Sequence, residues 1–324
     1  MDIVKRYSDN PVLSPQAVPY ECSLAFNAGV TKFKGKYVMV FRCDYGLTED
    51  TFKEGKTFGT RLGLAISDDG IKWNIDKEKN ILNHLISKEI TRVYDPRLTV
   101  INGRCYICFA IDTFHGIRGG IAVTDDFEKF EVLSMTVPDN RNMVLFPEKL
   151  NGLFMRLERP FPVYSRGGMD RFDIWISNSP DCLFWGNSAL LLGVEDVSWA
   201  NDKLGPGAPP IKTKDGWLTV FHVVDIDHKR GKNGWETGWR KRYSMGLMLL
   251  DLTNPYKIKS LYKEPLMMPE TQYETQTGFR KNVIFPGGMI LEDNGEVKIY
   301  YGAADTCECL ATVDLDDLLK LLRK

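Results

Sequence analysis

Short apolar stretches bounded by polar turns recur five times along the chain. Each copy begins with a strand-like segment, crosses a turn that contains glycine, and returns as an apolar, aromatic-rich strand such as residues 37–41 (YVMVF). A third strand then ends in a polar turn followed by an aromatic residue, as in SDDG before Trp73. Repeats of about 40–50 residues that each hold several short strands are typical of β-propellers. The pattern predicts an all-β chain, one five-bladed propeller over residues 1–324, with a short C-terminal helix whose apolar stripe is Leu315, Leu318, Leu319 and Leu322.

Proline identifies the innermost strand of each predicted blade. Proline has no backbone N–H to donate to a sheet ladder, so within sheets it is confined to edge strands. In a propeller the strand that faces the central channel is such an edge. Four of the five opening strands contain proline, at Pro96, Pro147, Pro209 with Pro210, and Pro286.

The composition and net charge of the chain argue against several classes of protein. The net charge of −1 over 324 residues gives no global field that would attract nucleic acid or an anionic membrane. The chain begins without an apolar leader and contains no run of 18 apolar residues, which argues against a secreted or membrane-spanning protein. The seven cysteines are odd in number and scattered, as in reduced cytoplasmic proteins. We therefore expect a cytoplasmic protein.

Two closely spaced cysteine pairs make a zinc site one possible interpretation. Cys105 and Cys108 form a CxxC, and Cys307 with Cys309 a CxC. Cys105 and Cys108 lie in an alternating strand, where side chains three positions apart point to opposite faces. Chelation by that pair would need a turn that the sequence does not contain. We predict small buried core residues and no metal.

Polar residues gather at one rim of the predicted propeller. Because neighbouring strands are antiparallel, the start of each inner strand and the end of the second strand share a rim. Each charged pair there has an ordinary alternative as a surface ion pair. Charged side chains from all five blades would meet at the same end of the central channel. Such a pocket has both hydrogen-bond donors and acceptors, which suits a polyhydroxylated ligand. The residues at this rim are Asn27, Arg42, Asp44, Asp95, Arg97, Asp112, Glu158, Arg159, His222, Asp225 and Asp305.

A second set is basic and flanks the inner and second strands of blades two to four. Arginine supplies planar bidentate donors and lysine a point charge, a combination that holds phosphate. Each residue alone could be an ordinary surface residue, whereas their shared position predicts an anion site. The set comprises Arg141, Arg159, Lys203, His222 and Tyr243.

Several of these residues stand in short motifs that follow one another along nearly the whole chain. The motifs are Asn27, RCD at 42–44, YDPR at 94–97, RN at 141–142, Lys203 with GPG at 205–207, and YGAADT at 301–306. In this combination the chain resembles glycoside hydrolase family 130, the β-mannoside phosphorylases and their hydrolytic relatives. The resemblance implies a five-bladed propeller, in agreement with the repeat count.

The resemblance also implies residue roles. Asp95 would be the general acid, acting indirectly through the 3-hydroxyl of the mannose. Asn27, Arg42, Asp44 and Asp305 would hold the mannosyl unit, and we add Arg97 because it is two positions from Asp95. Arg141, Arg159, Lys203, His222 and Tyr243 would bind phosphate. The hydrolytic relatives lack much of this basic set, so its presence favours phosphorolysis.

The predicted activity is inverting phosphorolysis of β-mannosides to α-mannose 1-phosphate, with inorganic phosphate as co-substrate and no cofactor. Inverting hydrolysis needs an acid and a base to activate water. Phosphate is already an anionic nucleophile, so a basic pocket that positions it can replace the base. The alternatives are a hydrolase of the same fold and a non-catalytic glycan-binding propeller. The linkage (β-1,4 or β-1,2), the acceptor sugar and a homo-oligomeric state stay open.

One segment does not fit the family pattern. Residues 225–242 hold six lysines or arginines with Trp235 and Trp239 among them. Interleaved basic and aromatic residues can bind single-stranded nucleic acid. A solvated loop, an acceptor-sugar rim and a subunit contact are the other interpretations, and we predict no nucleic-acid or membrane partner.

Overall fold

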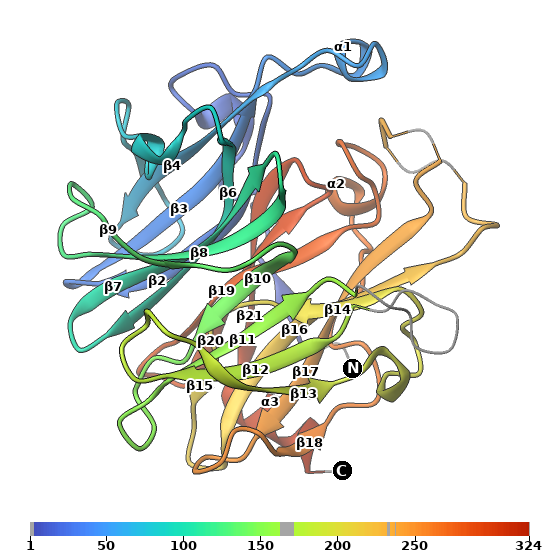
Figure 1. Ribbon diagram of the computed structural model, residues 1–324. Helices are drawn as coiled ribbons and strands as arrows, with labels where there is room; N and C mark the ends of the chain where they lie inside the picture. The colour runs from blue at the N-terminus through green and yellow to red at the C-terminus, as the bar shows by residue number, and fades with distance from the viewer. Residues whose placement is uncertain (1–2, 163–171, 232–233, 237, 324) are drawn as a thin grey trace.

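The computed structural model describes residues 3–162, 172–231, 234–236 and 238–323. Its strands form five antiparallel sheets arranged as a five-bladed propeller (Figure 1), which confirms the predicted fold. Blade 1 holds β2 (Leu24–Phe33), β3 (Lys36–Tyr45), β4 (Gly59–Ser67) and β5 (Asn74–Ile75). Blade 2 holds β6 (Ile90–Ile101), β7 (Arg104–Thr113), β8 (Gly116–Thr124) and β9 (Glu131–Met135). Blade 3 holds β10 (Asn140–Leu145), β11 (Phe154–Pro160), β12 (Ile174–Ser179) and β13 (Gly186–Leu192).

The last two blades depart slightly from this plan. Blade 4 holds β14 (Lys203–Pro206), β15 (Ile211–Lys212), β16 (Trp217–Ile226), β17 (Lys241–Leu250) and β18 (Ile258–Leu261). Blade 5 holds β19 (Ile284–Leu291), β20 (Glu296–Ala303), β21 (Cys307–Asp314) and, as its outermost strand, β1 (Lys5–Arg6). Five short helices lie between strands of the described residues, and α3 (Leu315–Leu322) follows the last strand. The five are η1 (Pro15–Ala17), α1 (Glu49–Lys53), η2 (Asn83–Leu85), η3 (Val194–Asp196) and α2 (Gln272–Thr275).

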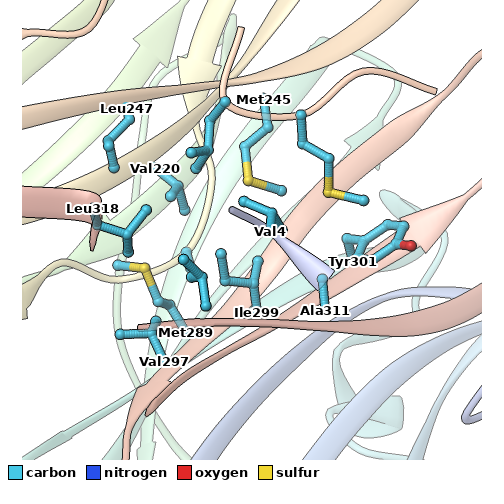
Figure 2. Packing of buried hydrophobic residues seen from close by; sticks show 14 of the residues in the cluster. Val4, Val220, Met245, Leu247, Met289, Val297, Ile299, Tyr301, Ala311 and Leu318 are labelled. Atoms are coloured by element: carbon cyan, nitrogen blue, oxygen red, sulfur yellow. The ribbon is translucent and has the colours of Figure 1, made fainter. Parts of the chain in front are cut away.

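The core lies between the blades, because each sheet has apolar residues on both faces and packs against two neighbours. Five buried clusters correspond to the five blade interfaces. Figure 2 shows the cluster between blades 4 and 5, where Val220 and Leu247 pack with Val297 and Ile299. Cys105 packs between blades 1 and 2 and Cys108 between blades 2 and 3, so the two thiols lie on opposite faces of one sheet.

The inner strands are interrupted by bulges. The register shifts between Phe26 and Gly29 in β2 and between Tyr94 and Arg97 in β6. Comparable shifts occur in β10 and β19. Residues within three of these bulges have a positive φ, 52° at Asn27, 50° at Asp95 and 58° at Asn142. A bulge redirects side chains and is over-represented beside active sites, so these positions point to a functional site at the axis.

The polar turns on the outer rim act as local caps. Asp69 Oδ1 accepts the backbone N–H groups of Ile71 and Lys72, each at 2.8 Å. Asp126 and Asp181 make the same pair of bonds in blades 2 and 3. Aspartate suits this position because its side chain bonds the backbone two and three residues on.

The strand β1, near the start of the chain, pairs with β21, near its end. Lys5 and Arg6 pair with Thr312 and Ala311 on β21. Arg6 Nε donates to Glu274 Oε1 at 2.8 Å and its Nη2 donates to the Met268 carbonyl at 2.6 Å. The last blade is therefore completed by residues from near the start of the chain.

The helix α3 covers the outer part of blades 4 and 5. Its N-cap Asp314 accepts the Asp316 N–H at 2.9 Å, and Leu318, Leu319 and Leu322 are buried in the cluster of Figure 2, as the stripe predicted. Within the described ranges no helix combines the length and the apolar character needed to cross a bilayer.

Leu318 offers a test of this packing. Leu318→Ala is expected to lower the free energy of unfolding by about 2–5 kcal/mol, because a fully buried leucine leaves a cavity when it is truncated. Denaturant titration of both proteins measures the difference. Lys320→Ala on the exposed face of α3 is the control and should change stability by less than about 0.5 kcal/mol. A similarly small effect of Leu318→Ala would mean that α3 is not docked on the propeller.

Candidate active site

Asp95 occupies the bulge of β6 and is held from two other positions. Asn27 Nδ2 donates to Asp95 Oδ1 at 3.1 Å, and Arg42 Nη1 lies 3.5 Å from the same oxygen. Burial by itself raises the pKa of a carboxyl, but the charges of Arg42, Arg141 and Arg97 outweigh it. The pKa of Asp95 therefore lies below its usual value, and the carboxyl is ionised at neutral pH in the unliganded protein.

Arg42 and Asp44 form a fixed pair on β3. Arg42 Nη2 donates to Asp44 Oδ2 at 2.7 Å, and Thr60 Oγ1 donates to Asp44 Oδ1 at 2.6 Å. The Arg42 guanidinium lies over the rings of Phe26 and Tyr94, 4.7 and 5.2 Å from their centroids. The two-residue spacing thus places both side chains on one face, as predicted.

Asp305 follows β20 with a φ of 49° and meets a residue that sequence reasoning missed. Arg280 Nη1 donates to Asp305 Oδ2 at 3.3 Å, and Arg280 Nε donates to Glu236 Oε2 at 2.7 Å. The pKa of Asp305 lies above its usual value, mainly because the carboxyl is buried and also because of the negative charge of Asp95. The positive charges of Arg280 and Arg42 only partly offset this rise. Arg280 lies in a loop before β19 without strand periodicity, so no pattern in the sequence pointed to it.

Arg97 has a different environment from the one that its spacing suggested. Its Nε, Nη1 and Nη2 donate to the carbonyl oxygens of Gly207, Pro96 and Pro286 at 2.8, 2.7 and 3.3 Å. The bulge between Tyr94 and Arg97 interrupts the two-residue period on which the pairing with Asp95 was based. Arg97 therefore joins the inner strands of blades 2, 4 and 5, and its contact with substrate stays a prediction.

Arg141 and Arg159 stand directly opposite each other on β10 and β11. Like charges in facing positions of a sheet destabilise it unless a counter-charge is present. Arg159 is only 1% exposed, and among the described residues its Nε and Nη2 have no hydrogen-bond partner, nor does Arg141 Nε. Burial and the charge of Arg141 lower the pKa of Arg159 to about 9. Buried guanidinium groups with unused donors are an arrangement that an anion would stabilise.

His222 extends this cluster as a neutral side chain. Its Nδ1 lies 3.2 Å from the Pro206 carbonyl, which can only accept, so the proton is on Nδ1. Its Nε2 then accepts from Arg159 Nη1 at 3.1 Å. Burial and the charge of Arg159 keep the pKa of His222 well below its usual value. His222 therefore orients Arg159 without adding charge.

Lys203 and Tyr243 complete the basic set. Burial and the charge of Arg159 lower the pKa of Lys203 to about 6. Tyr243 stacks on His222 with ring centroids 6.0 Å apart and on Trp239 with centroids 5.9 Å apart. Burial raises the pKa of Tyr243, so its hydroxyl is a neutral donor. All five residues predicted to bind an anion thus lie in one region, and Arg141 also affects the pKa of Asp95.

Three carboxylates of the predicted rim have partners of their own. Asp112 accepts from the Tyr94 hydroxyl at 2.7 Å, and Asp225 from Arg230 and Arg242 at 2.6 and 2.8 Å. Glu158 pairs with Arg156 at 2.8 Å. In the part of the chain that the structure describes, no group of three or more His, Cys, Asp and Glu side chains is arranged to hold a metal ion.

Residues 232, 233 and 237 of the segment 225–242 lie outside the described residues, and the described tryptophans of this segment contact the loop before blade 5. Trp235 meets Phe279 edge to face with centroids 5.5 Å apart, and Trp239 Nε1 donates to the Lys281 carbonyl at 3.3 Å. The guanidinium of Arg280 lies 4.8 Å from the Trp239 ring. Its tryptophans therefore pack on protein rings beside Asp305.

Comparison with known proteins agrees with this geometry. A family profile described as β-1,4-mannooligosaccharide phosphorylase matches residues 1–324. The β-1,4-mannooligosaccharide phosphorylase of Ruminococcus albus is 32% identical over 99% of this chain and 91% of its own. The 1,2-β-oligomannan phosphorylase of a Thermoanaerobacter species is 32% identical over 97% of this chain and 98% of its own.

A solved structure supports the same assignment. The β-1,2-mannobiose phosphorylase of Listeria innocua, in complex with β-1,2-mannobiose, superposes with a TM-score of 0.82 at 26% identity and covers 99% of both chains. The family expected from the motifs and its glycoside phosphorylase class are confirmed. The chain belongs to glycoside hydrolase family 130.

Proposed function

We propose that this protein cleaves β-mannosides with inorganic phosphate and inversion, releasing α-mannose 1-phosphate. The observation that carries the proposal is the facing pair Arg141 and Arg159, buried with unused donors beside the Asp95 carboxyl. The relatives named above act on β-1,4- and β-1,2-linked mannosides, which supports a β-mannoside as substrate.

The proposed reaction needs few protein groups. A phosphate oxygen held by Arg141 and Arg159 attacks the anomeric carbon from the face opposite the leaving sugar, and the bond to the glycosidic oxygen breaks. The proton of Asp95 passes through the 3-hydroxyl of the mannose, as the family resemblance implies, to that oxygen. Because the nucleophile is already an anion, its positioning and partial neutralisation replace a general base.

Asp95 must hold a proton at the moment of cleavage, although its carboxyl is ionised in the unliganded protein. Arg42 and Arg141 keep its pKa low. A phosphate dianion bound at Arg141 offsets that positive charge and raises the pKa of Asp95. We infer that bound phosphate has two roles: it is the nucleophile, and it favours the protonated form of Asp95. Phosphate binding is therefore coupled to protonation of the general acid.

Lys203 gives this coupling a measurable consequence. With a pKa of about 6, Lys203 is neutral at pH 8 in the unliganded protein, and a phosphate dianion favours its charged form. Phosphate binding at pH 8 is therefore expected to take up protons, with Lys203 as one acceptor in addition to Asp95. Calorimetric titration in buffers of different ionisation enthalpy measures the uptake. Lys203→Met should reduce it, and an unchanged value would show that Lys203 does not titrate with phosphate.

The rival activity is hydrolysis by the same fold. Incubation of β-1,4-mannobiose and β-1,2-mannobiose with and without phosphate separates the two, and product analysis also identifies the linkage. Phosphorolysis predicts mannose 1-phosphate only when phosphate is present. Equal cleavage without phosphate would rule out the proposal.

A further inference from the structure

We propose that a cavity between blades 2 and 3 is a second saccharide site, which binds a neutral oligosaccharide outside the axial pocket. The cavity has a volume of about 620 Å³ and lies between β9 of blade 2 and the sheet of blade 3. This volume falls within the range of about 300–1,000 Å³ for small-molecule sites. The lining residues that carry the argument are Asn140, Arg156, Glu158, Phe161, Trp175 and Trp185.

The cavity is separated from the anion cluster by the sheet of blade 3. Glu158 and Arg159 are neighbours on β11, so their side chains leave opposite faces. Arg159 joins the axial cluster, whereas Glu158 lines the cavity. The ring of Phe161 lines the cavity too, and its centroid lies 5.7 and 5.6 Å from the guanidinium carbons of Arg159 and Arg141. The two sites are therefore adjacent, and the Phe161 ring borders both of them.

The polar groups of the cavity are buried and only partly satisfied. Arg156 Nη2 pairs with Glu158 Oε2 at 2.8 Å, and Asn140 Nδ2 donates to the same oxygen at 2.6 Å. Arg156 is 5% exposed, yet in the part of the chain that the structure describes its Nε has no hydrogen-bond partner, and neither has Asn140 Oδ1. One unused donor and one unused acceptor therefore remain on side chains that line the cavity, and leaving such groups unpaired costs about 1–3 kcal/mol each.

The indole rings of Trp175 and Trp185 indicate that the cavity binds a saccharide. Trp175 stands opposite Glu158 in the register of β11 and β12, and Trp185 lies under Arg156 with 4.1 Å from guanidinium carbon to ring centroid. The charged residues of the described lining are the paired Arg156 and Glu158 and the buried Asp173, which accepts the Val194 N–H at 2.9 Å, so the lining offers no cationic site to an anion. A pyranose presents an apolar face to an indole and hydroxyls to the unused donor and acceptor. A purely apolar ligand would leave both polar atoms unpaired.

The test begins with a protein whose axial pocket is disabled. The double variant Arg42→Ala, Asp305→Ala is titrated calorimetrically with β-1,4-mannotriose and β-1,2-mannotriose. We expect saturable binding that Trp175→Ala, added to this background, weakens at least tenfold. Ser188→Trp places a large ring at an exposed position in the lining and should block the cavity even if Trp175→Ala folds poorly. Phe184→Ala, beside the cavity but 75% exposed, is the matched control and should bind as the background does.

Two results would overturn the inference: no saturable binding to the double variant, or binding that survives both Trp175→Ala and Ser188→Trp. In the otherwise unmodified protein, Trp175→Ala should retain phosphorolysis of mannobiose within about twofold. A loss of that activity together with binding would mean that the cavity is part of the axial site. The titrations use the disabled pocket, so they decide the question whether or not the proposed phosphorolysis is found.

Discussion

Asp95→Asn is expected to lower kcat for mannoside phosphorolysis by about 10²–10⁴-fold, the usual contribution of general acid catalysis. Asparagine has nearly the shape of aspartate and can still meet Asn27, but it cannot deliver a proton. The substitution also removes the negative charge beside Arg42 and Arg141. KM for phosphate should therefore stay the same or fall, because the cluster has become more cationic.

Initial rates of mannose 1-phosphate formation, with each substrate varied in turn, separate kcat from the two KM values. Asp112→Asn is the matched control, because Asp112 lies on the second strand of the same blade and accepts from Tyr94. It should keep kcat within a few-fold of the unmodified protein. A decrease of less than tenfold for Asp95→Asn would remove Asp95 from the role of acid.

Arg159→Ala is expected to raise KM for phosphate by about 10–100-fold and KM for the mannoside by less than about threefold. The range corresponds to the loss of a hydrogen bond to a charged group, about 1.5–3 kcal/mol. The asymmetry follows from geometry, since Arg159 faces Arg141 across the sheet and bonds His222, with no contact to Arg42 or Asp44 among the described residues.

Arg159→Lys keeps a charge at this position but loses the planar fork, so its KM for phosphate should be intermediate. Arg118→Ala tests for a general effect of charge, because Arg118 lies in blade 2 and pairs with Glu89 at 3.9 Å. Equal rises in both KM values for Arg159→Ala would show that Arg159 does not hold phosphate specifically.

The blades could be predicted from the sequence because their signals are local. Apolar strands and glycine turns recur in every blade, and the period of two separates Cys105 from Cys108. The same period could have separated Glu158 from Arg159, whose adjacency in sequence places them on opposite faces. Grouping both at the axial rim overlooked this rule, and Glu158 lies in the cavity between blades instead.

Other features depend on contacts between distant segments. The bulges that turn Asn27 and Asp95 into the positive φ region leave no periodic trace in the sequence. The bonds of Arg97 to Gly207 and Pro286 join three blades. Arg280 reaches Asp305 from a loop without a regular pattern. Such contacts join residues that are far apart in the sequence, so they can be recognised only in the three-dimensional structure.

The pairing of β1 with β21 has a consequence for how the molecule is made. Arg6 and Glu274 are 268 positions apart, so the ribosome must synthesise most of the polypeptide before they can meet. Until β21 has been synthesised, β1 has no strand to pair with, and its unpaired backbone groups can associate with other chains. Closure over such a sequence separation is slow. A bulky fusion joined directly to Lys5 would therefore be expected to reduce soluble yield more than the same fusion joined after Arg323.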